Sequence, residues 1–162
     1  RASTDKLGVN CRPDQRAVSG DAREGLVPTL AIGDPPARGP VAWIKTGLAA
    51  TTTGHAAVVA ADMPFLDPGL ITHLLERGDG HDAAVPRPGE WFEPLHAVYR
   101  SERVVSACER ALEAENPKIL EPLSRIDRVV VDRAELLEHG SLDSFEGVDT
   151  PEDIQWATER LQ

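Results

Sequence analysis

Short runs of small and β-branched residues alternate with longer helix-compatible runs along this chain. Such alternation is typical of strands that feed crossover helices, so the sequence predicts an α/β domain. The clearest predicted strand is 56–61, an unbroken apolar run that suits a central parallel strand covered on both faces. Because 162 residues suffice for one sizeable core and leave little room for a second, we expect residues 1–162 to form a single domain.

Helix caps mark the start of two predicted helices. Asp67 followed by Pro68 predicts an N-cap and a first turn, and Thr150 with Asp153 three residues later predicts a capping box. Within the predicted strand 94–99, alternate residues are expected to face opposite sides of the sheet. The other predicted strands are 7–11, 28–32, 83–86 and 128–132, and the other predicted helices are 13–24, 41–50, 101–113 and 117–124.

The charge balance is strongly acidic, with 17 Lys and Arg against 27 Asp and Glu and a net charge of −10. This balance argues against a protein that binds a nucleic-acid backbone or an anionic membrane. The two cysteines, Cys11 and Cys108, form no metal-binding or disulfide pattern, so we expect a reducing, cytoplasmic compartment. No apolar run approaches the roughly 18 to 20 residues that a membrane-spanning helix needs.

Polar residues follow several of the predicted strands. Asn10 and Asp62 come at strand ends, Asp34 lies in the loop after the second strand, and Asp149 precedes the last helix. Ligands of open α/β sheets bind at the carboxyl ends of the strands, and such oxygen donors suit Mg²⁺ together with substrate phosphates. Each residue also has a structural interpretation, with Asp34 in a turn and Asp149 as a helix cap.

A Gly39-Pro40 turn directly precedes the predicted helix 41–50. The first amides of that helix can face an anion or a nucleobase carbonyl, although a plain helix start has the same composition. His96 lies inside a predicted strand, so we interpret it as a packed or half-exposed histidine rather than a ligand. The chain has no Walker loop, GxGxxG or GxSxG motif, which removes the main support for P-loop, dinucleotide-binding and serine-hydrolase chemistry.

Four segments in order resemble the molybdenum cofactor guanylyltransferases and their nucleotidyltransferase relatives. The segments are Gly-Pro-Val-Ala at 39–42, Ala-Ala-Asp-Met-Pro-Phe-Leu at 60–66, Glu-Pro-Leu-His-Ala-Val-Tyr-Arg at 93–100 and Val-Asp-Thr-Pro-Glu-Asp at 148–153. The resemblance implies a three-layer α/β/α fold of the nucleotide-diphospho-sugar-transferase type with a mostly parallel, Rossmann-like sheet. It also implies transfer of GMP from GTP to molybdopterin with release of pyrophosphate.

The resemblance also assigns roles to individual residues. Asp62 matches the family's catalytic aspartate, which binds Mg²⁺ and through it the GTP phosphates. Asn10 and Asp34 match nucleotide contacts, and Gly39 with Pro40 match the nucleotide-binding turn. Asp149 falls where the family commonly has an asparagine, and we expect it to supply a second metal ligand. The implied cofactor is Mg²⁺, and the implied partners are GTP and molybdopterin.

The family's N-terminal glycine-rich loop has no counterpart here, because only nine residues precede Asn10. The resemblance therefore implies an N-terminally truncated domain, whose exposed sheet edge favours a homodimer. One alternative is a sister nucleotidyltransferase that uses CTP or another phosphorylated acceptor. A second is a degenerate, non-catalytic nucleotide-binding homologue, which Trp43 and Gly147 favour because both depart from the family pattern. A third is an interaction domain without a small ligand.

Overall fold

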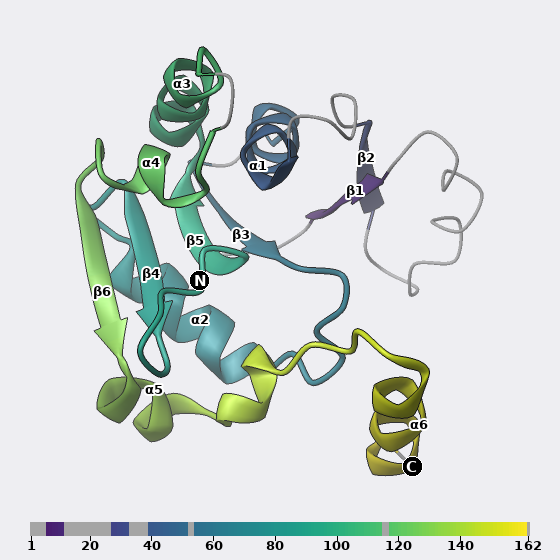
Figure 1. Cartoon of the computed structure of the whole chain (residues 1–162). Coiled ribbons are helices and arrows are strands. Elements are labelled where there is room, and N and C mark those ends of the chain that lie inside the picture. Colours follow the sequence, from purple (N-terminus) through teal and green to yellow (C-terminus); the bar gives the residue numbers. More distant parts are fainter. Residues whose placement is uncertain (1–5, 12–26, 33–38, 52–53, 115–116, 162) are drawn as a thin grey trace.

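The computed structural model describes residues 6–11, 27–32, 39–51, 54–114 and 117–161, with side chains from residue 39 onward (Figure 1). Strand β1 (Lys6–Cys11) pairs in parallel with β2 (Val27–Ile32). The predicted helix 13–24 and the predicted site residue Asp34 lie outside the described residues. Within the described part of the chain, no helix is long and apolar enough to cross a membrane.

A four-stranded sheet forms the centre of the molecule. Its strand order is β3 (His55–Val59), β5 (His96–Arg100), β4 (Ala83–Arg87) and β6 (Arg128–Asp132). Strand β5 runs antiparallel to both of its neighbours, whereas β4 and β6 are parallel. It follows that β3, β4 and β6 all run in one direction, so their carboxyl ends lie at the same edge of the sheet.

Helices cover both faces of this sheet (Figure 1). Helices α1 (Gly39–Ala49), α3 (Ser101–Ala111) and α4 (Leu120–Leu123) lie on one face. Helices α2 (Pro68–Arg77) and α5 (Arg133–His139) lie on the other. The predicted three-layer α/β/α arrangement is thereby confirmed.

Period-two alternation on β4 and β5 divides the core into two clusters. In β5, Ala97 and Tyr99 pack toward α1 and α3, and Val98 packs toward α2 and α5, as the sequence predicts for strand 94–99. The Tyr99 hydroxyl, which is fully buried, donates to the Pro94 carbonyl oxygen at 2.6 Å. That bond removes the desolvation cost of burying the hydroxyl, so the tyrosine contributes its whole ring to the core.

Two features of the fold differ from the sequence-based expectation. Within the described residues β3 pairs with β5 alone and is half-buried, rather than being a central parallel strand covered on both faces. An apolar run indicates that the faces of a strand are covered. It does not indicate how many strands pair with its edges, or in which direction they run. The second difference is that α5 and the 3₁₀ helix η4 (Leu142–Phe145) were not among the predicted elements, because both are too short to show a helical period.

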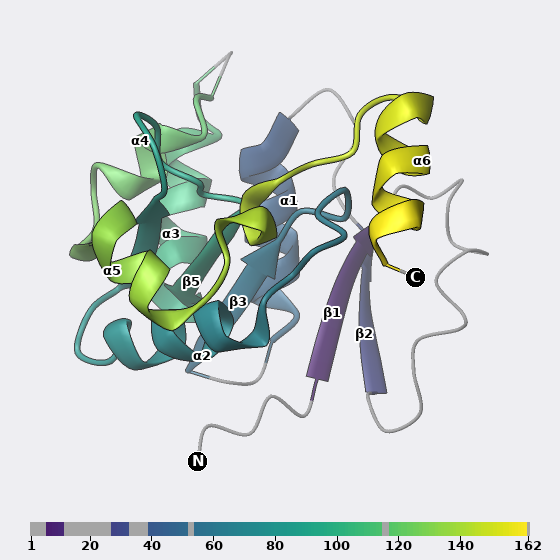
Figure 2. The same ribbon diagram turned by 90° about the horizontal axis from the view of Figure 1, so that it is seen from below.

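Helix α6 (Pro151–Arg160) starts as the sequence predicts, with both hydrogen bonds of the capping box between Thr150 and Asp153. The helix lies apart from the four-stranded sheet and the helices that cover it, at the end of the segment that follows η4 (Figures 1 and 2). Its Trp156 ring meets the Phe65 ring edge-on, with centroids 5.1 Å apart. This contact connects α6 to the turn that carries Asp62.

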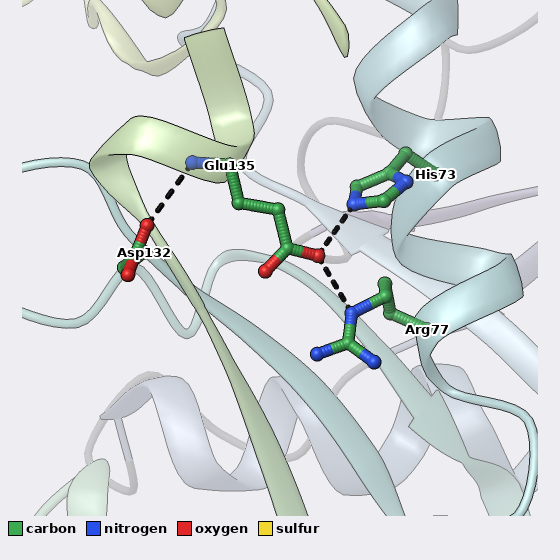
Figure 3. Close-up of polar contacts among 4 residues, drawn as sticks. All are labelled: His73, Arg77, Asp132 and Glu135. Carbon is green, nitrogen blue, oxygen red and sulfur yellow. Dashed lines mark hydrogen bonds and ion pairs between the residues drawn. The ribbon is translucent and has the colours of Figure 1, made fainter. Parts of the chain in front are cut away.

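A charged cluster joins α2 to α5 (Figure 3). One Glu135 carboxylate oxygen lies 2.8 Å from His73 Nε2 and 2.6 Å from Arg77 Nε. The His73 ring, which is almost fully buried, stacks on the His139 ring with centroids 3.6 Å apart. The cluster therefore holds the two helices on the same face of the sheet, where their apolar sides share one core cluster.

The N-terminus of α2 also touches the C-terminus of α5. Asp67 caps α2 as predicted, its Oδ1 accepting from the amides of Gly69 and Leu70 at 2.7 and 3.4 Å. Its Oδ2 accepts from the Ser141 amide at 2.9 Å, and a Cβ on Gly140 would lie only 2.6 Å from that oxygen. These bonds lower the pKa of Asp67, so the carboxylate stays charged and stabilises both chain segments.

We expect Asp67→Ala to lower the free energy of unfolding by about 1 to 2 kcal/mol, because it removes a helix N-cap and the acceptor for Ser141. Urea unfolding at pH 7 measures the change. Asp79→Ala is the matched control, since Asp79 is exposed and its carboxylate bonds to no described residue; its effect should stay within about 0.5 kcal/mol. Equal effects of the two substitutions would contradict the role given to Asp67.

Candidate functional site

The carboxyl edge of the sheet gathers the loops that follow three strands. The turn after β3 carries Asp62, the loop after β4 carries Trp91 and Glu93, and α5 follows β6 directly. A cavity of about 500 Å³ opens between the β4 loop and the segment that precedes α6. We call it the carboxyl-edge cavity, and the side chains used below are Trp91, Glu93, Arg133, Asp143 and Glu146.

Asp62 lies on an exposed turn, and its carboxylate makes no hydrogen bond or ion pair with any described residue. The turn is fixed through its backbone, because the Val148 amide donates to the Asp62 carbonyl oxygen at 2.8 Å. A Cβ added to Gly147 would lie 3.8 Å from Asp62 Oδ2. The segment before α6 therefore runs directly beside the aspartate.

His96 stands behind this turn and has no exposed surface. Its Nδ1 lies 3.4 Å from Met63 Sδ, its Nε2 lies 3.3 Å from Ser144 Oγ, and its ring centroid lies 4.4 Å from that of Phe145. A thioether sulfur can only accept, so a hydrogen bond to Met63 places the ring proton on Nδ1 and leaves Nε2 to accept from Ser144. The sequence-based interpretation of His96 as a packed histidine is confirmed.

The same chain of contacts continues to Asp67. The Asp67 amide donates to Ser144 Oγ at 2.9 Å, so one hydroxyl joins the start of α2, the 3₁₀ helix and β5. Burial lowers the pKa of His96 to about 4, and the nearby Asp67 charge opposes only part of that effect. The imidazole is therefore neutral at pH 7 and acts as a fixed part of the scaffold.

The two residues predicted to hold a metal ion lie on neighbouring segments. Asp62 is beside Val148, and Asp149 is the next residue along the chain. Asp149 is exposed, and its amide donates to Asp153 Oδ2 at 3.2 Å within the capping box. The described residues contain no group of three or more His, Cys, Asp or Glu side chains arranged to hold a metal ion. The role of Asp149 as a metal ligand stays a prediction.

The chemistry of the donors at the carboxyl edge suits a hard divalent cation. Mg²⁺ in nucleotide enzymes is commonly held by one or two carboxylates, with phosphate oxygens and waters as its other ligands. An exposed carboxylate without a protein partner, as at Asp62, meets that requirement, because no existing bond has to break. The role of Asp62 as a metal ligand stays a prediction, with which its exposed carboxylate is compatible.

Gly39 and Pro40 open α1, as the predicted nucleotide-binding turn requires. Gly39 has φ +65°, a left-handed conformation that side chains other than glycine adopt with strain. The first turn of α1 holds no acidic residue, so nothing in it competes with an anion for the helix N-terminus. Asn10 is part of β1, and its side chain is outside the described ones; its predicted nucleotide contact stays a prediction.

The carboxyl-edge cavity holds residues that the sequence analysis did not single out. Trp91 is 72% exposed at its rim, and burial raises the pKa of Glu93. Arg133 donates through Nη1 to the Pro88 carbonyl oxygen at 2.9 Å, which ties the β4 loop to the start of α5. The available sequence signal was a tryptophan within a segment rich in Gly, Pro and Glu, a composition that predicts a loop.

Covalent chemistry has little support in the described residues. Cys108 is fully buried on α3, and burial raises the pKa of its thiol to about 12, so the reactive thiolate does not form near neutral pH. His96 is buried in the scaffold, and His73 is engaged by Glu135. The carboxyl edge instead offers carboxylates, a helix N-terminus and an exposed aromatic ring, which together suit the binding of a metal-associated anion.

Comparison with known proteins identifies relatives over nearly the whole chain. Residues 1–129 match the family described as MobA-like NTP transferase domain. A Natronomonas pharaonis protein named "Probable molybdenum cofactor guanylyltransferase" is 59% identical over 160 residues, which cover 99% of this chain and 79% of that protein. A Haloferax mediterranei protein of the same name is 30% identical over 158 residues, covering 98% of this chain and 75% of that protein.

Solved structures show the same fold. The crystal structure of molybdopterin-guanine dinucleotide biosynthesis protein A from Archaeoglobus fulgidus matches with a TM-score of 0.72 and 30% identity, over 95% of this chain and 77% of that one. The 2-C-methyl-D-erythritol 4-phosphate cytidylyltransferase of Thermus thermophilus matches with a TM-score of 0.66 at 16% identity, over 96% and 81%. The second similarity concerns the fold alone. The predicted nucleotide-diphospho-sugar-transferase type of fold is confirmed.

We expect the protein to lose stability as the pH falls from about 6.5 toward about 4, because unfolded His96 takes up a proton that the folded state excludes. The loss through this one group is on the order of 3 kcal/mol. Urea unfolding at pH 7, 5.5 and 4.5 measures it, and His96→Gln should give a shallower pH dependence over this range. A His55→Gln control should keep the slope of the native protein, and an unchanged slope in His96→Gln would refute the assignment.

Proposed function

Because the chain belongs to the MobA-like NTP transferase family, we propose that it transfers GMP from GTP to molybdopterin in molybdenum cofactor biosynthesis. The observation that carries the proposal is the 59% identity, over 99% of this chain, to a protein named as such a guanylyltransferase. The exposed Asp62 carboxylate at the carboxyl edge gives this assignment a chemical basis.

The nucleotide side of the site would use Asp62 and the start of α1. Bound Mg²⁺ would offset the negative charge of the triphosphate. Asp62 would hold that ion without losing another bond, and its turn stays in place through the hydrogen bond from Val148. The first amides of α1, after the Gly39-Pro40 turn, would donate to phosphate or nucleobase oxygens. Asn10 and Asp34 complete the proposed nucleotide contacts.

The acceptor side would use the carboxyl-edge cavity, which lies at the same edge of the sheet as Asp62. Its volume of about 500 Å³ is in the range of small-molecule sites. The exposed Trp91 ring offers a stacking surface for a planar heterocycle, and Glu93 offers acceptors for ring N–H groups. Asp143 and Glu146 each pair with Arg160 through one carboxylate oxygen, which leaves the other oxygen to accept. These features fit the pterin ring system of molybdopterin.

The proposed reaction is an in-line displacement at the α-phosphorus of GTP. An oxygen of the acceptor phosphate forms the new bond to that phosphorus, while the bond to the bridging oxygen breaks and pyrophosphate leaves. The attacking phosphate is already anionic, so the chain needs no general base. This requirement agrees with the carboxylates that the described residues place at the carboxyl edge.

GTP use implies a cytoplasmic protein, which we include in the proposal together with molybdopterin as the second substrate. A homodimer formed through a sheet edge stays a prediction. Two alternatives remain distinct from the proposal: a sister enzyme that uses CTP or another acceptor, and a homologue that binds nucleotide without turnover. The choice of nucleotide distinguishes the proposal from the first alternative. Turnover of the bound nucleotide distinguishes it from the second.

We expect GTP with Mg²⁺ to raise the melting temperature on the order of 5 °C at saturation, because a ligand that binds only the folded state stabilises it. ATP and CTP should give smaller shifts. Differential scanning fluorimetry of the native chain and of Asp62→Asn measures the effect, which should vanish in the variant. Asp79→Asn, a second exposed aspartate, should keep it. A larger shift with CTP, or none with any nucleotide, would reject the guanylyltransferase proposal.

We expect Trp91→Ala to raise the KM for molybdopterin by about three- to tenfold, because it removes the stacking surface at the cavity rim. The KM for GTP should stay within about twofold, since Trp91 lines the cavity and Asp62 is not among its lining residues. Steady-state release of pyrophosphate with each substrate varied in turn measures both values. A change confined to the KM for GTP would contradict the proposed acceptor side. Leu137→Ala, an exposed apolar residue on α5 outside the cavity, serves as the control.

A further inference from the structure

A second cavity, about 400 Å³ in volume, lies at the edge of the sheet opposite Asp62. Strand β5 sets the distance between this cavity and the Asp62 turn. His96 pairs with Val59 near that turn, and Arg100 pairs with His55 at the other end of the strand. Four residues of strand span about 13 Å. We call this cavity the arginine pocket; its charged residues are Arg100, Arg103, Arg110, Arg125, Asp82 and Glu102.

The fold builds this pocket from the outer side of α3. Arg103, Ser106 and Arg110 are spaced by three and four residues, so they lie on one face of the helix. The opposite face of α3, with Val104 and Cys108, is buried in the core. Helix α4 packs beside α3, and Arg125 follows its C-terminus, which brings a fourth guanidinium to the same cavity.

The arginines of this pocket outnumber its carboxylates by four to two. Two of them have protein partners: Arg103 Nε lies 3.9 Å from Asp82 Oδ1, and Arg125 Nη2 lies 3.1 Å from Glu121 Oε1. The guanidinium groups of Arg100 and Arg110 make no hydrogen bond or ion pair with any side chain or backbone atom of the described residues. Their N–H donors are therefore available to a ligand.

This excess of positive charge is unusual for the chain, whose net charge is −10. A chain with that balance repels anions over most of its surface, so four arginines in one cavity create a local exception. Guanidinium groups present a planar fork of donors that matches phosphate oxygens in a bidentate way. The described residues of the lining include no aromatic ring on which a base could stack, so the pocket suits an oxyanion rather than a nucleobase.

We propose that the arginine pocket binds a small anion that carries phosphate groups, such as a phosphate ester or a polyphosphate, separately from the Asp62 site. Binding depends on the four guanidinium groups and needs no metal ion. The cavity volume is within the range of small-molecule sites, and its polar lining selects a charged ligand over an apolar one. The pocket thus adds a second ligand site to the one at the carboxyl edge.

Isothermal titration of the native chain with inorganic pyrophosphate tests the proposal. Protein and buffer are freed of metal ions on a chelating resin, so that pyrophosphate has no cation through which to reach Asp62. The expected result is saturable binding of one pyrophosphate per chain. Arg110→Gln should weaken it by about five- to tenfold, because one charge-assisted contact is lost.

Lys118→Gln is the matched control, since it removes one positive charge from an exposed residue outside the pocket. It should change the affinity by less than about twofold. The proposal is overturned if pyrophosphate shows no saturable binding or if both variants weaken it equally, which would indicate general charge attraction. Equal or tighter binding of citrate at the same ionic strength would also overturn it. Arg110 is exposed, and thermal unfolding verifies that its variant folds.

Discussion

The carboxyl edge of the sheet depends on one chain of polar contacts that runs from Asp67 through Ser144 to His96. Each member is held by a different element, and the chain closes at Met63, next to Asp62. A buried imidazole without hydrogen-bond partners would destabilise the folded state. Both nitrogens of the His96 ring have partners, which fixes the Asp62 turn, the 3₁₀ helix and β5 relative to one another. The backbone of Asp62 is thereby held in place.

The two ends of the sheet differ in charge. The carboxyl edge carries Asp62, Glu93 and Glu146, whereas the opposite edge carries the arginine pocket. In a chain with a net charge of −10, an acidic site has to recruit a cation before it can accept a phosphorylated substrate. The arginine pocket has no such requirement. The same class of anion can therefore be recognised at two places by two physical means.

The fold was largely predictable from the sequence, and the site only partly. Alternating apolar runs and helix caps predicted β4, β5 and β6 together with α2 and α6, because these signals are local. Asp62 could be chosen because a polar residue after an apolar strand lies at the carboxyl edge of an α/β sheet. Neither the second bond of the Asp67 carboxylate, to Ser141, nor the partners of His96 could be predicted, since both join residues more than thirty positions apart.

By itself the sequence determined the α/β class, the starts of α2 and α6, and the family motifs. Only the tertiary structure decided that β5 runs against its neighbours, that Val148 fixes the Asp62 turn, and that four arginines from β5, α3 and the turn after α4 share one cavity. The physical reason is the sequence distance over which each interaction acts, because helix caps and hydrophobic periodicity involve only a few neighbouring residues. Strand direction, burial and charge clusters depend instead on which distant segments the hydrophobic core brings together.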